Sequence, residues 1–287
     1  MGRKLGERLV PYYRRNPCPL GENKGEAAFA GVSDTLCAHK VPAVCCSDGP
    51  SGMRLDCGRK AFSLPNGTLL ACTFNEKLNE ELFTLLGVEM ISNEVDVLLG
   101  PGMNIHRHPL NGRNFEYFSE DPLVTGKIAA AQLRGLHASG VTGAIKHFCA
   151  NNNEANRGNC NAYLPLRLKY EYYYAAFENA IRYGGAKSIM AAYNEINGVP
   201  GICNPDIQNI LKDIWGLWFV VSDGGDFSQT VVSHKYCETH SQSLAMSIKA
   251  GADTMTDNEE LVRNAALSAL KKGELTEADI DLTLYNV

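Results

Sequence analysis

Short and nearly unbroken apolar runs recur along the chain, separated by longer segments with helical periodicity. Because these runs do not alternate with polar residues, they are typical of parallel strands covered on both faces. The pattern predicts strands over 41–47, 95–99, 143–149, 187–193, 217–223 and, with a weaker apolar signal, 252–256. Repeated strand–helix units predict an α/β fold with right-handed crossovers. A doubly wound sheet and a closed barrel both fit this order of elements.

Polar caps and glycines mark the helix ends. Asn75 is expected to cap a helix whose apolar face carries Leu78, Leu82, Leu85 and Val88. Other helices are predicted from Asp121-Pro122 to Gly140, from Pro165 to Gly184, over 205–215 and 239–250, from Asp257 to Gly273, and from Thr276, where Asp279 completes a capping-box pattern. Residues 1–40 predict an irregular segment. With neither linker nor repeat, residues 1–287 are expected to form one domain.

Composition narrows the class of protein. Of 287 residues, 45% are hydrophobic and 21% are charged, which is typical of a globular protein in water. The net charge is −5 with both signs interspersed, so neither nucleic acid nor a membrane surface is an expected partner. No apolar run reaches the ~18 residues of a membrane span. The N-terminus lacks the apolar stretch of a secretory signal, and a cytoplasmic location is expected.

Ten cysteines are present, and none are spaced as Cys-x-x-Cys. Several of them, including Cys45, Cys46 and Cys149, lie in apolar runs that predict strands. They are therefore expected to be reduced, buried, small apolar side chains, since a disulfide framework fits a chain of this size poorly.

Charged residues gather where the predicted strands end. Because the carboxyl ends of parallel strands meet at one edge of a sheet, these side chains are expected to converge there. They are Asp48 and Arg54, Arg113 and Glu116, Lys146, His147 and Arg157, Tyr193, and Asp223. Singly, each also fits a turn, a cap or a buried ion pair, but the recurrence at five strand ends favours a shared site. Carboxylates and guanidinium groups can pair with vicinal hydroxyls, so a polyhydroxylated ligand suits this set.

Other chemistries have less support from the sequence. Neither phosphate-binding glycine motif occurs, and GPSG at 49–52 is one residue short of a nucleophile elbow. His106 and His108 have no evident carboxylate or thiolate partner, so loop hydrogen bonding is expected and no metal or cofactor is predicted. A barrel enzyme of another chemistry, such as an aldolase using Lys146, stays open as a third and weaker alternative.

Five stretches together resemble glycoside hydrolase family 3, which includes many β-glucosidases and β-xylosidases. They are SDGPSGMR (47–54), GPGMNIHRHPLNGRNFEYFSEDP (100–122), KHFCANNNEANR (146–157), SIMAAYNEINGVP (188–200) and FVVSDGG (219–225). The matches are long, lie in the family's order and extend from about residue 16 to the end. The resemblance implies the N-terminal catalytic barrel of the family, a TIM-like (β/α)8 barrel that is incomplete or collapsed in some members, and a retaining mechanism.

The resemblance also implies roles for individual residues. Asp223 is expected to be the nucleophile that attacks the anomeric carbon. Asp48 is expected to bind the outer hydroxyls of the terminal sugar. The residues expected around that sugar are Arg54, Arg113, Lys146, His147, Arg157, Met190 and Tyr193. The cationic neighbours are expected to keep Asp223 ionised. The implied function is a retaining exo-β-glycosidase of the β-glucosidase type, acting on β-linked glycosides or oligosaccharides without a cofactor.

A second carboxyl group is the missing part of this site. Retaining glycosidases need an acid/base roughly 5–5.5 Å from the nucleophile, and the family usually takes it from a second α/β-sandwich domain. That domain has no counterpart before Val287, so the acid/base is expected outside this chain, in a missing domain or a partner chain. The local carboxylates that could be proposed as the acid/base are Glu116, Glu154 and Glu195. Of these, Glu116 and Glu154 are expected to orient arginines and loops instead. A catalytically incomplete sugar-binding or partner-docking barrel is the alternative.

Two further stretches depart from the family's pattern. WGLWFVVSD is one residue short, with Trp218 in place of a polar–Gly pair, and this is expected to strain the entry to its strand. The helix after Leu166 carries Tyr170 and Tyr172–Tyr174. Buried packing is the default expectation for these tyrosines, and an exposed aromatic surface is the alternative.

Overall fold

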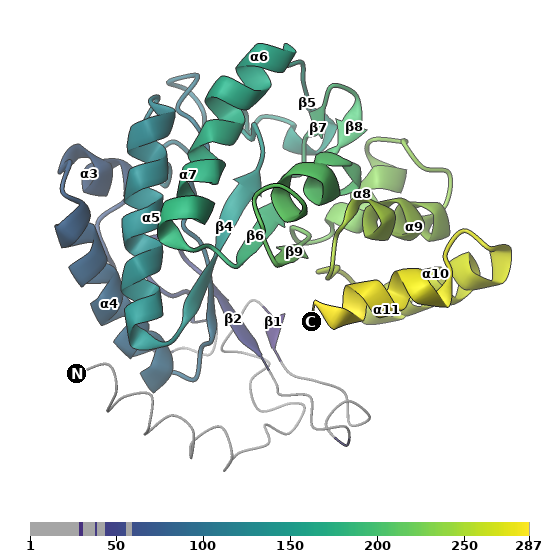
Figure 1. Cartoon of the computed structure of the whole chain (residues 1–287), viewed down its shortest axis with the longest axis horizontal. Helices are drawn as coiled ribbons and strands as arrows, with labels where there is room; N and C mark the ends of the chain where they lie inside the picture. Colours follow the sequence, from purple (N-terminus) through teal and green to yellow (C-terminus); the bar gives the residue numbers. More distant parts are fainter. Residues whose placement is uncertain (1–28, 31–37, 39–43, 56–58, 287) are drawn as a thin grey trace.

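The computed structural model describes residues 29–30, 38, 44–55 and 59–286, and the greater part of the predicted irregular segment 1–40 lies outside them (Figure 1). The main sheet is ordered β1 (Phe29–Ala30), β2 (Cys45–Asp48), β3 (Val97–Leu99), β4 (Thr142–Phe148), β6 (Ser188–Ala191) and β9 (Phe219–Val221). Strand β1 is antiparallel to β2, and every later neighbour is parallel. A parallel bridge joins Val221 to Thr254, in the sixth predicted strand. The first five predicted strands are thus confirmed in place: β3, β6 and β9 are shorter than predicted, β4 is shifted by one residue, and β2 ends one residue later. Among the described residues, the sixth is present only as this single bridge.

The strand order separates the two architectures that the sequence leaves open. From β2 to β9 each parallel strand lies beside the next one along the chain. A doubly wound sheet would reverse its order at a switch point, whereas a barrel winds in one direction. Each of these strands also contributes one residue to a shared apolar cluster: Cys46, Leu99, Ala144, Met190 and Val221. The fold is therefore a TIM-like barrel, and among the described residues no strand pairing closes it.

Three helices lie side by side over the outer face of the first strands (Figure 1). They are α4 (Glu76–Ser92), α5 (Pro122–Ser139) and α7 (Ala175–Gly184). Helix α5 begins as predicted, because the Asp121 carboxylate accepts bonds from the amides of Leu123 and Val124 at 2.6 and 3.0 Å. Gly140 caps its C-terminus with a φ of 93°, in the left-handed region that favours glycine.

Helix α4 turns a different face to the core than the sequence predicts. Asn75 caps it as expected, but Leu85 is 67% exposed and Val88 is 40% exposed. The buried residues are instead Asn79, Phe83, Leu86, Gly87 and Met90. Both faces carry apolar side chains, so the choice is made by the neighbouring helix. Gly135 of α5 approaches so closely that a Cβ there would lie 2.4 Å from the carbonyl oxygen of Glu80.

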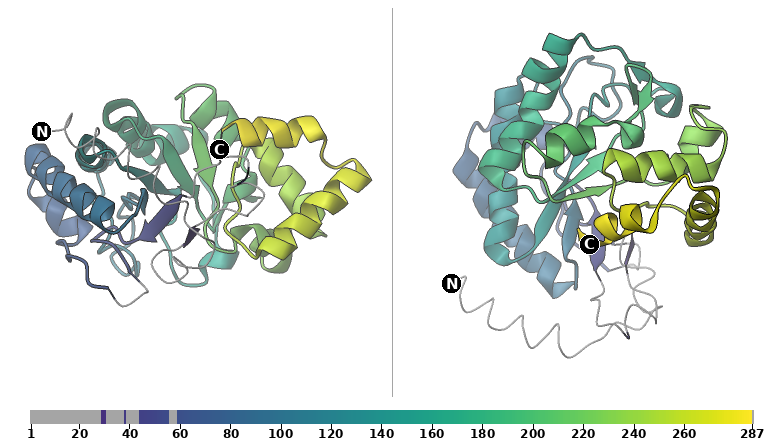
Figure 2. Two further views of the ribbon diagram at one scale, coloured as in Figure 1. Left: turned by 90° about the horizontal axis from the view of Figure 1, so that it is seen from below. Right: turned by 45° about the vertical axis from the view of Figure 1, so that its right-hand side comes forward.

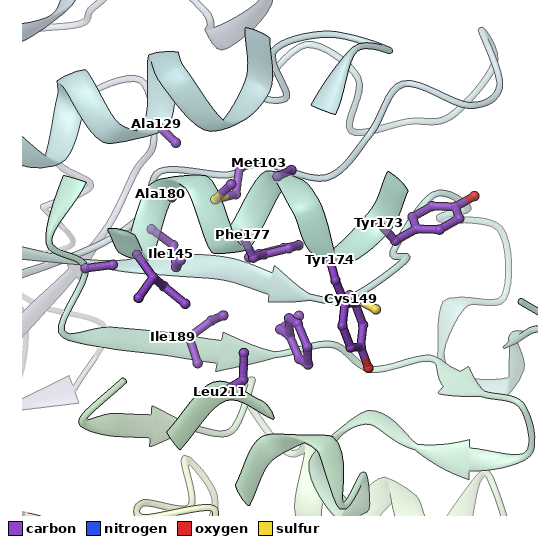
Figure 3. Packing of buried hydrophobic residues seen from close by; sticks show 14 of the residues in the cluster. Met103, Ala129, Ile145, Cys149, Tyr173, Tyr174, Phe177, Ala180, Ile189 and Leu211 are labelled. Carbon is purple, nitrogen blue, oxygen red and sulfur yellow. The ribbon is translucent and has the colours of Figure 1, made fainter. Parts of the chain in front are cut away.

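The largest part of the core lies between β4, β6 and the helix that runs from Leu166 to Gly184. This helix comprises α6 (Leu166–Leu168), a π-helical turn η2 (Lys169–Tyr174) and α7. Figure 3 shows Ile145 and Ile189 of the strands and Phe177 of the helix, which belong to one buried cluster. Tyr173 and Tyr174 are buried in the same cluster, and the Tyr174 hydroxyl donates to Asp206 at 2.6 Å. Buried packing therefore accounts for most of the tyrosine cluster.

A second group of helices follows β9 and lies beside that edge of the sheet (Figure 2). It consists of α8 (Asp226–Val232), α9 (His240–Ala250), α10 (Glu259–Lys272) and α11 (Glu277–Tyr285). The capping box of Thr276 and Asp279 at the start of α11 is confirmed. The predicted cap of α10 is wrong by one residue: Asn258 accepts from the amide of Leu261, while Asp257 accepts from the Ser228 amide and hydroxyl.

The entry to β9 is not strained, contrary to the prediction. Gly216 takes up the turn with a φ of 72°, and Trp218 is not among the described residues with left-handed backbone. The Trp218 side chain is 55% exposed, so the extra bulk points away from the packed core.

Smaller elements complete the described chain. They are α3 (Gly67–Cys72), the short helices η1 (Arg157–Asn159), η3 (Gly201–Cys203) and η4 (Ile207–Lys212), and a sheet of β5 (Asn161–Ala162), β7 (Glu195–Ile196) and β8 (Val199–Pro200). This small sheet lies beyond the carboxyl ends of β4 and β6 (Figure 1). Cys45, Cys46 and Cys149 are buried thiols, as predicted. None of the helices in the described ranges has the length and apolarity to cross a bilayer.

Candidate active site

The carboxyl end of β2 brings Asp48 against Lys146 of β4. The lysine ammonium donates to the Asp48 carboxylate at 3.1 Å, and the Arg54 guanidinium lies 3.9 Å from the other carboxylate oxygen. The turn between Asp48 and Arg54 is closed by a 2.7 Å bond from the Arg54 amide to the Asp48 carbonyl. Lys146 is buried while Asp48 is partly exposed, so the carboxylate is oriented from below and can still meet a ligand. This pairing engages the Lys146 ammonium with Asp48 and adds no support for Schiff-base chemistry.

His147 lies next to Asp223, at the carboxyl ends of β4 and β9. Its Nε2 is 3.5 Å from a carboxylate oxygen of Asp223. Complete burial lowers the pKa of His147 well below its usual value, and the positive charges of Arg113, Lys146 and Arg157 lower it further. The ring is therefore neutral at physiological pH, and a proton on Nε2 would face the carboxylate. Asn104 fixes this residue by exchanging two hydrogen bonds with its backbone, at 2.8 and 2.9 Å.

Asp223 combines partial burial with a single strong backbone contact. The amide of Gly224 donates to its carboxylate at 2.7 Å, and the side chain is 17% exposed. Burial raises the pKa of Asp223, whereas the Gly224 amide and the charges of Lys146, Arg113 and Arg157 lower it. The cations act in the predicted direction, but the net shift is upward. A carboxylate in this condition is poorly solvated and more reactive as a nucleophile.

Tyr193 connects the loop after β9 to the loop after β4. Its hydroxyl donates to the carbonyl of Gly224 at 2.5 Å, and the Arg157 guanidinium stacks over its ring at 4.4 Å from the centroid. Burial raises the pKa of Tyr193, and the nearby Asp223 adds to the rise. The phenol therefore stays protonated and acts as a donor on this wall of the site.

Two glutamates bind the arginines, as predicted. Glu116 forms an ion pair with Arg113, whose guanidinium also lies 3.8 Å from Glu154. Glu154 accepts from Arg157 at 3.0 Å, so it stands between two arginines that come from different loops. Because both carboxylates are occupied in this way, neither is a free acid in the described site.

The structure brings together the predicted residues Asp48, Arg54, Arg113, Lys146, His147, Arg157, Tyr193 and Asp223 through these contacts. Met190 is different: it is 3% exposed and belongs to the apolar cluster of the strands, so it supports the floor of the site. For the pair of histidines, loop hydrogen bonding is confirmed. His106 lies 2.9 Å from the Asn114 carbonyl, and His108 accepts from the Leu110 amide at 3.2 Å.

Two residues behind the site are not predicted from the sequence. His234 lies with its Nε2 2.8 Å from the carbonyl of Tyr193 and its Nδ1 3.6 Å from Glu195. Asp226 begins α8 and is completely buried, and neither of its carboxylate oxygens has a hydrogen-bond partner within the described part of the chain. The sequence does show a carboxylate at Asp226, three residues after Asp223. It does not show that this carboxylate is buried, because the burial depends on how the helices pack.

Replacing Asp226 with asparagine is expected to stabilise the protein at neutral pH. Burial raises the pKa of Asp226 well above its usual value, and Asp223 and Asp257 raise it further. As the pH rises above the unfolded-state pKa of about 3.9, the unfolded chain releases this proton first, so the unfolding free energy falls until the folded pKa is passed. Asp226→Asn removes this decrease in the unfolding free energy. A gain of about 1 kcal/mol in unfolding free energy would raise the melting temperature by roughly 2–4 °C.

Thermal unfolding of both proteins between pH 4 and pH 8 tests this expectation. The difference in melting temperature should grow with pH, since only the natural residue titrates. Asp281→Asn, at an exposed position of α11, is the matched control and should leave the curve unchanged. A loss of stability in Asp226→Asn that is equal at every pH would contradict the prediction.

Comparison with known proteins identifies the family. Residues 25–287 match the family described as "Glycosyl hydrolase family 3 N terminal domain". The chain belongs to this family. The family 3 chain is 48% identical over 266 residues to a β-glucosidase of Ruminococcus albus, covering 91% of the chain and 28% of that protein. It is 36% identical over 198 residues to an exo-α-(1→6)-L-arabinopyranosidase of Bifidobacterium longum, covering 64% of the chain and 26% of that protein.

A solved structure agrees with this assignment. β-Glucosidase 3B of Thermotoga neapolitana, in complex with α-D-glucose, superposes with a TM-score of 0.82 at 30% identity. The match covers 99% of the family 3 chain and 42% of the Thermotoga chain. The chain therefore spans less than a third of the two curated relatives and less than half of this solved protein. Family membership makes it a glycoside hydrolase domain with the TIM-like barrel of that family.

Proposed function

We propose that this domain is the barrel of a retaining exo-β-glycosidase that releases terminal non-reducing β-D-glucosyl or related residues. The observation that carries the proposal is Asp223 at the end of β9. Its carboxylate is bound by the Gly224 amide, lies 3.5 Å from a neutral His147 and retains 17% exposure among the cations of neighbouring strand ends. A reactive carboxylate in a polar, hydroxyl-binding surround is what nucleophilic attack on a sugar requires.

The proposed reaction has two balanced steps. In the first, an oxygen of Asp223 forms a bond to the anomeric carbon while the bond to the leaving oxygen breaks, and an acid delivers a proton to that oxygen. In the second, water attacks the same carbon, gives its proton to the conjugate base and releases the carboxylate. Two displacements at one carbon retain the β configuration. Hydrogen bonds to the ring hydroxyls that tighten in the oxocarbenium-like transition state supply part of the rate.

The sugar is proposed from the charge and geometry of the surrounding groups. Asp48, held by Lys146, offers two acceptor oxygens to adjacent hydroxyls, and Arg54 lies beside it. This suits the equatorial hydroxyls that glucose and xylose share. The name of the Ruminococcus relative supports a glucosyl unit, while that of the Bifidobacterium relative is an arabinopyranosidase. The glucosyl preference is accordingly part of the proposal, as are a β-linked glycoside or oligosaccharide substrate and a cytoplasmic location.

The acid/base is proposed to come from outside this chain, in a second domain or a partner chain. Glu116 and Glu154 are engaged by arginines, and Glu195 lies against His234. The same observation favours the alternative, a sugar-binding or partner-docking barrel without hydrolytic activity of its own. The two functions differ in one property: only the enzyme forms a covalent bond between Asp223 and the sugar.

A mechanism-based trap distinguishes them. A 2-deoxy-2-fluoro-β-glucoside with a dinitrophenolate leaving group needs no acid for its departure, because the leaving group is stable as an anion. We expect incubation to add one fluoroglucosyl unit, found by mass spectrometry on the peptide that contains Asp223. Asp223→Asn is the control and should remain unlabelled. Binding of glucose without any adduct would favour the alternative function, and an adduct on another residue would overturn the nucleophile assignment.

A further inference from the structure

A pocket lies at the amino ends of the strands, whereas the candidate active site lies at their carboxyl ends. Its volume is about 370 Å³, within the range of small-ligand pockets. It lies at the amino ends of β6 and β9, where the end of α11 comes close to the start of β9 (Figures 1 and 2). Its lining includes the charged and polar residues Lys187, Gln208, Lys212, Asp213, Asp253 and Asn286 and the apolar residues Trp218, Ile248 and Leu282. This hollow is called the Trp218 pocket.

The floor of the Trp218 pocket is a rigid and electrically satisfied ion pair. Lys212 donates to both oxygens of Asp253, at 2.7 and 2.8 Å. The same carboxylate accepts from the Val220 amide at 2.8 Å and from the side chain of Asn286 at 2.9 Å. Four hydrogen bonds from three donor groups fix the position of this carboxylate and leave it with little remaining charge to offer a cation.

One wall of the Trp218 pocket is aromatic. Trp218 is 55% exposed and lines the hollow together with the apolar side chains of Ile248 and Leu282. An indole has a broad apolar face and one N–H donor at its edge. A pyranose ring has a matching character, with C–H groups on its faces and hydroxyls around its rim.

The charges of the Trp218 pocket cancel. Lys187 and Lys212 bring two positive charges, and Asp213 and Asp253 bring two negative charges. A phosphate site would need an excess of donors and a metal site an excess of acceptors. Gln208, whose amide nitrogen donates to Asp213 at 2.7 Å, adds a carbonyl acceptor, and Lys187 adds an ammonium donor. Mixed donors and acceptors around a flat apolar wall suit a neutral polyhydroxylated ring.

We propose that the Trp218 pocket binds a neutral glucosyl unit, stacked on the Trp218 indole. This site goes beyond the proposed function, because it would bind a sugar without catalysing a reaction. It lies at the amino ends of the strands, and Asp223 lies at the carboxyl end of β9. A single such contact is weak, in the millimolar range, for which the binding free energy is about −4 kcal/mol. Its effect is to keep an oligosaccharide near the domain. Once one sugar unit is held in the Trp218 pocket, binding of another unit at a second site becomes an intramolecular event.

Tryptophan fluorescence tests the proposal directly, because the chain has two tryptophans. Trp215 packs against Tyr174 with ring centroids 5.9 Å apart, so Trp218 is the more exposed reporter. We expect cellobiose, added to the Asp223→Asn protein so that no turnover occurs, to protect Trp218 from acrylamide quenching with a dissociation constant of about 1–10 mM. Trp218→Ala should abolish this protection, and Trp218→Phe should retain saccharide binding in calorimetry with reduced affinity.

Two controls separate this site from the candidate active site and from a general surface effect. Tyr285→Ala removes another exposed aromatic ring of the neighbouring α11 and should leave the protection unchanged. Adding Asp48→Ala weakens sugar binding at the candidate active site and should also leave the Trp218 response intact. A response that disappears with Asp48→Ala, that survives Trp218→Ala, or that inorganic phosphate produces as well would overturn the proposal. So would the absence of any response to cellobiose.

Discussion

Replacing Asp223 with glycine is expected to lower the hydrolysis of aryl β-glucosides by about 10⁴-fold or more, as loss of a nucleophile does in other covalent catalysts. The reason is geometric as well as chemical. Asp223 presents its carboxylate from the end of β9 beside His147, whereas Glu116 and Glu154 are paired with arginines and Glu195 lies against His234. Kinetics should be measured with a dinitrophenyl glucoside, in the protein that carries its acid/base.

Azide makes this experiment diagnostic of the role of Asp223. In Asp223→Gly the removed side chain leaves room on the face opposite the leaving group, so azide can enter there. We expect azide to restore the release of dinitrophenolate and to form the α-glucosyl azide, by a single inversion. Asp281→Asn serves as the control and should show neither the loss nor the rescue. A β-glucosyl azide would identify Asp223 as the acid/base, and an undiminished rate would remove it from the chemistry altogether.

Truncating Phe148 to alanine is expected to lower the unfolding free energy by about 3–5 kcal/mol, the range measured for buried aromatic residues. Phe148 ends β4 and is 1% exposed. Its ring lies 4.8 Å from that of Tyr174 and 5.3 Å from that of Phe177, with the second pair edge to face. The substitution therefore removes apolar contact and two aromatic pairs, each worth about 0.5–1.5 kcal/mol.

Urea unfolding followed by circular dichroism measures this loss. Phe62→Ala is the matched control, because Phe62 is 76% exposed and its truncation should change stability by less than about 0.5 kcal/mol. Since β4 also carries Lys146 and His147, the Phe148 variant should lose sugar affinity in parallel with stability. Equal effects of the two substitutions would show that the π-helical turn η2 repacks into the space, contrary to this account.

Much of the site is predictable because it is local in sequence. Asp48 and Asp223 each lie at the end of an apolar run and Lys146 lies within one, and parallel strands carry such residues toward one edge irrespective of the rest of the chain. The caps of α5 and α11 are predictable for the same reason, since a capping residue bonds to amides two or three positions away.

Features set by contacts between distant segments are not predictable in this way. The buried face of α4 is chosen by the close approach of α5 at Gly135, and both faces of α4 carry apolar residues. The isolation of Asp226 depends on the helices around it, and no sequence pattern distinguishes it from an exposed first-turn carboxylate. Trp218 is predicted to strain its strand because the sequence does not show that Gly216 redirects the chain before it.

Glu154 stands between Arg113 and Arg157, which belong to the loops after β3 and β4. A carboxylate shared in this way makes the two arginines interdependent, so their contributions to sugar recognition should be non-additive. Drawing one guanidinium toward a substrate hydroxyl frees part of Glu154 for the other arginine. Under the proposed function, a change of sugar preference is therefore expected to involve both loops together, because exchanging either arginine alters the ion pair of the other.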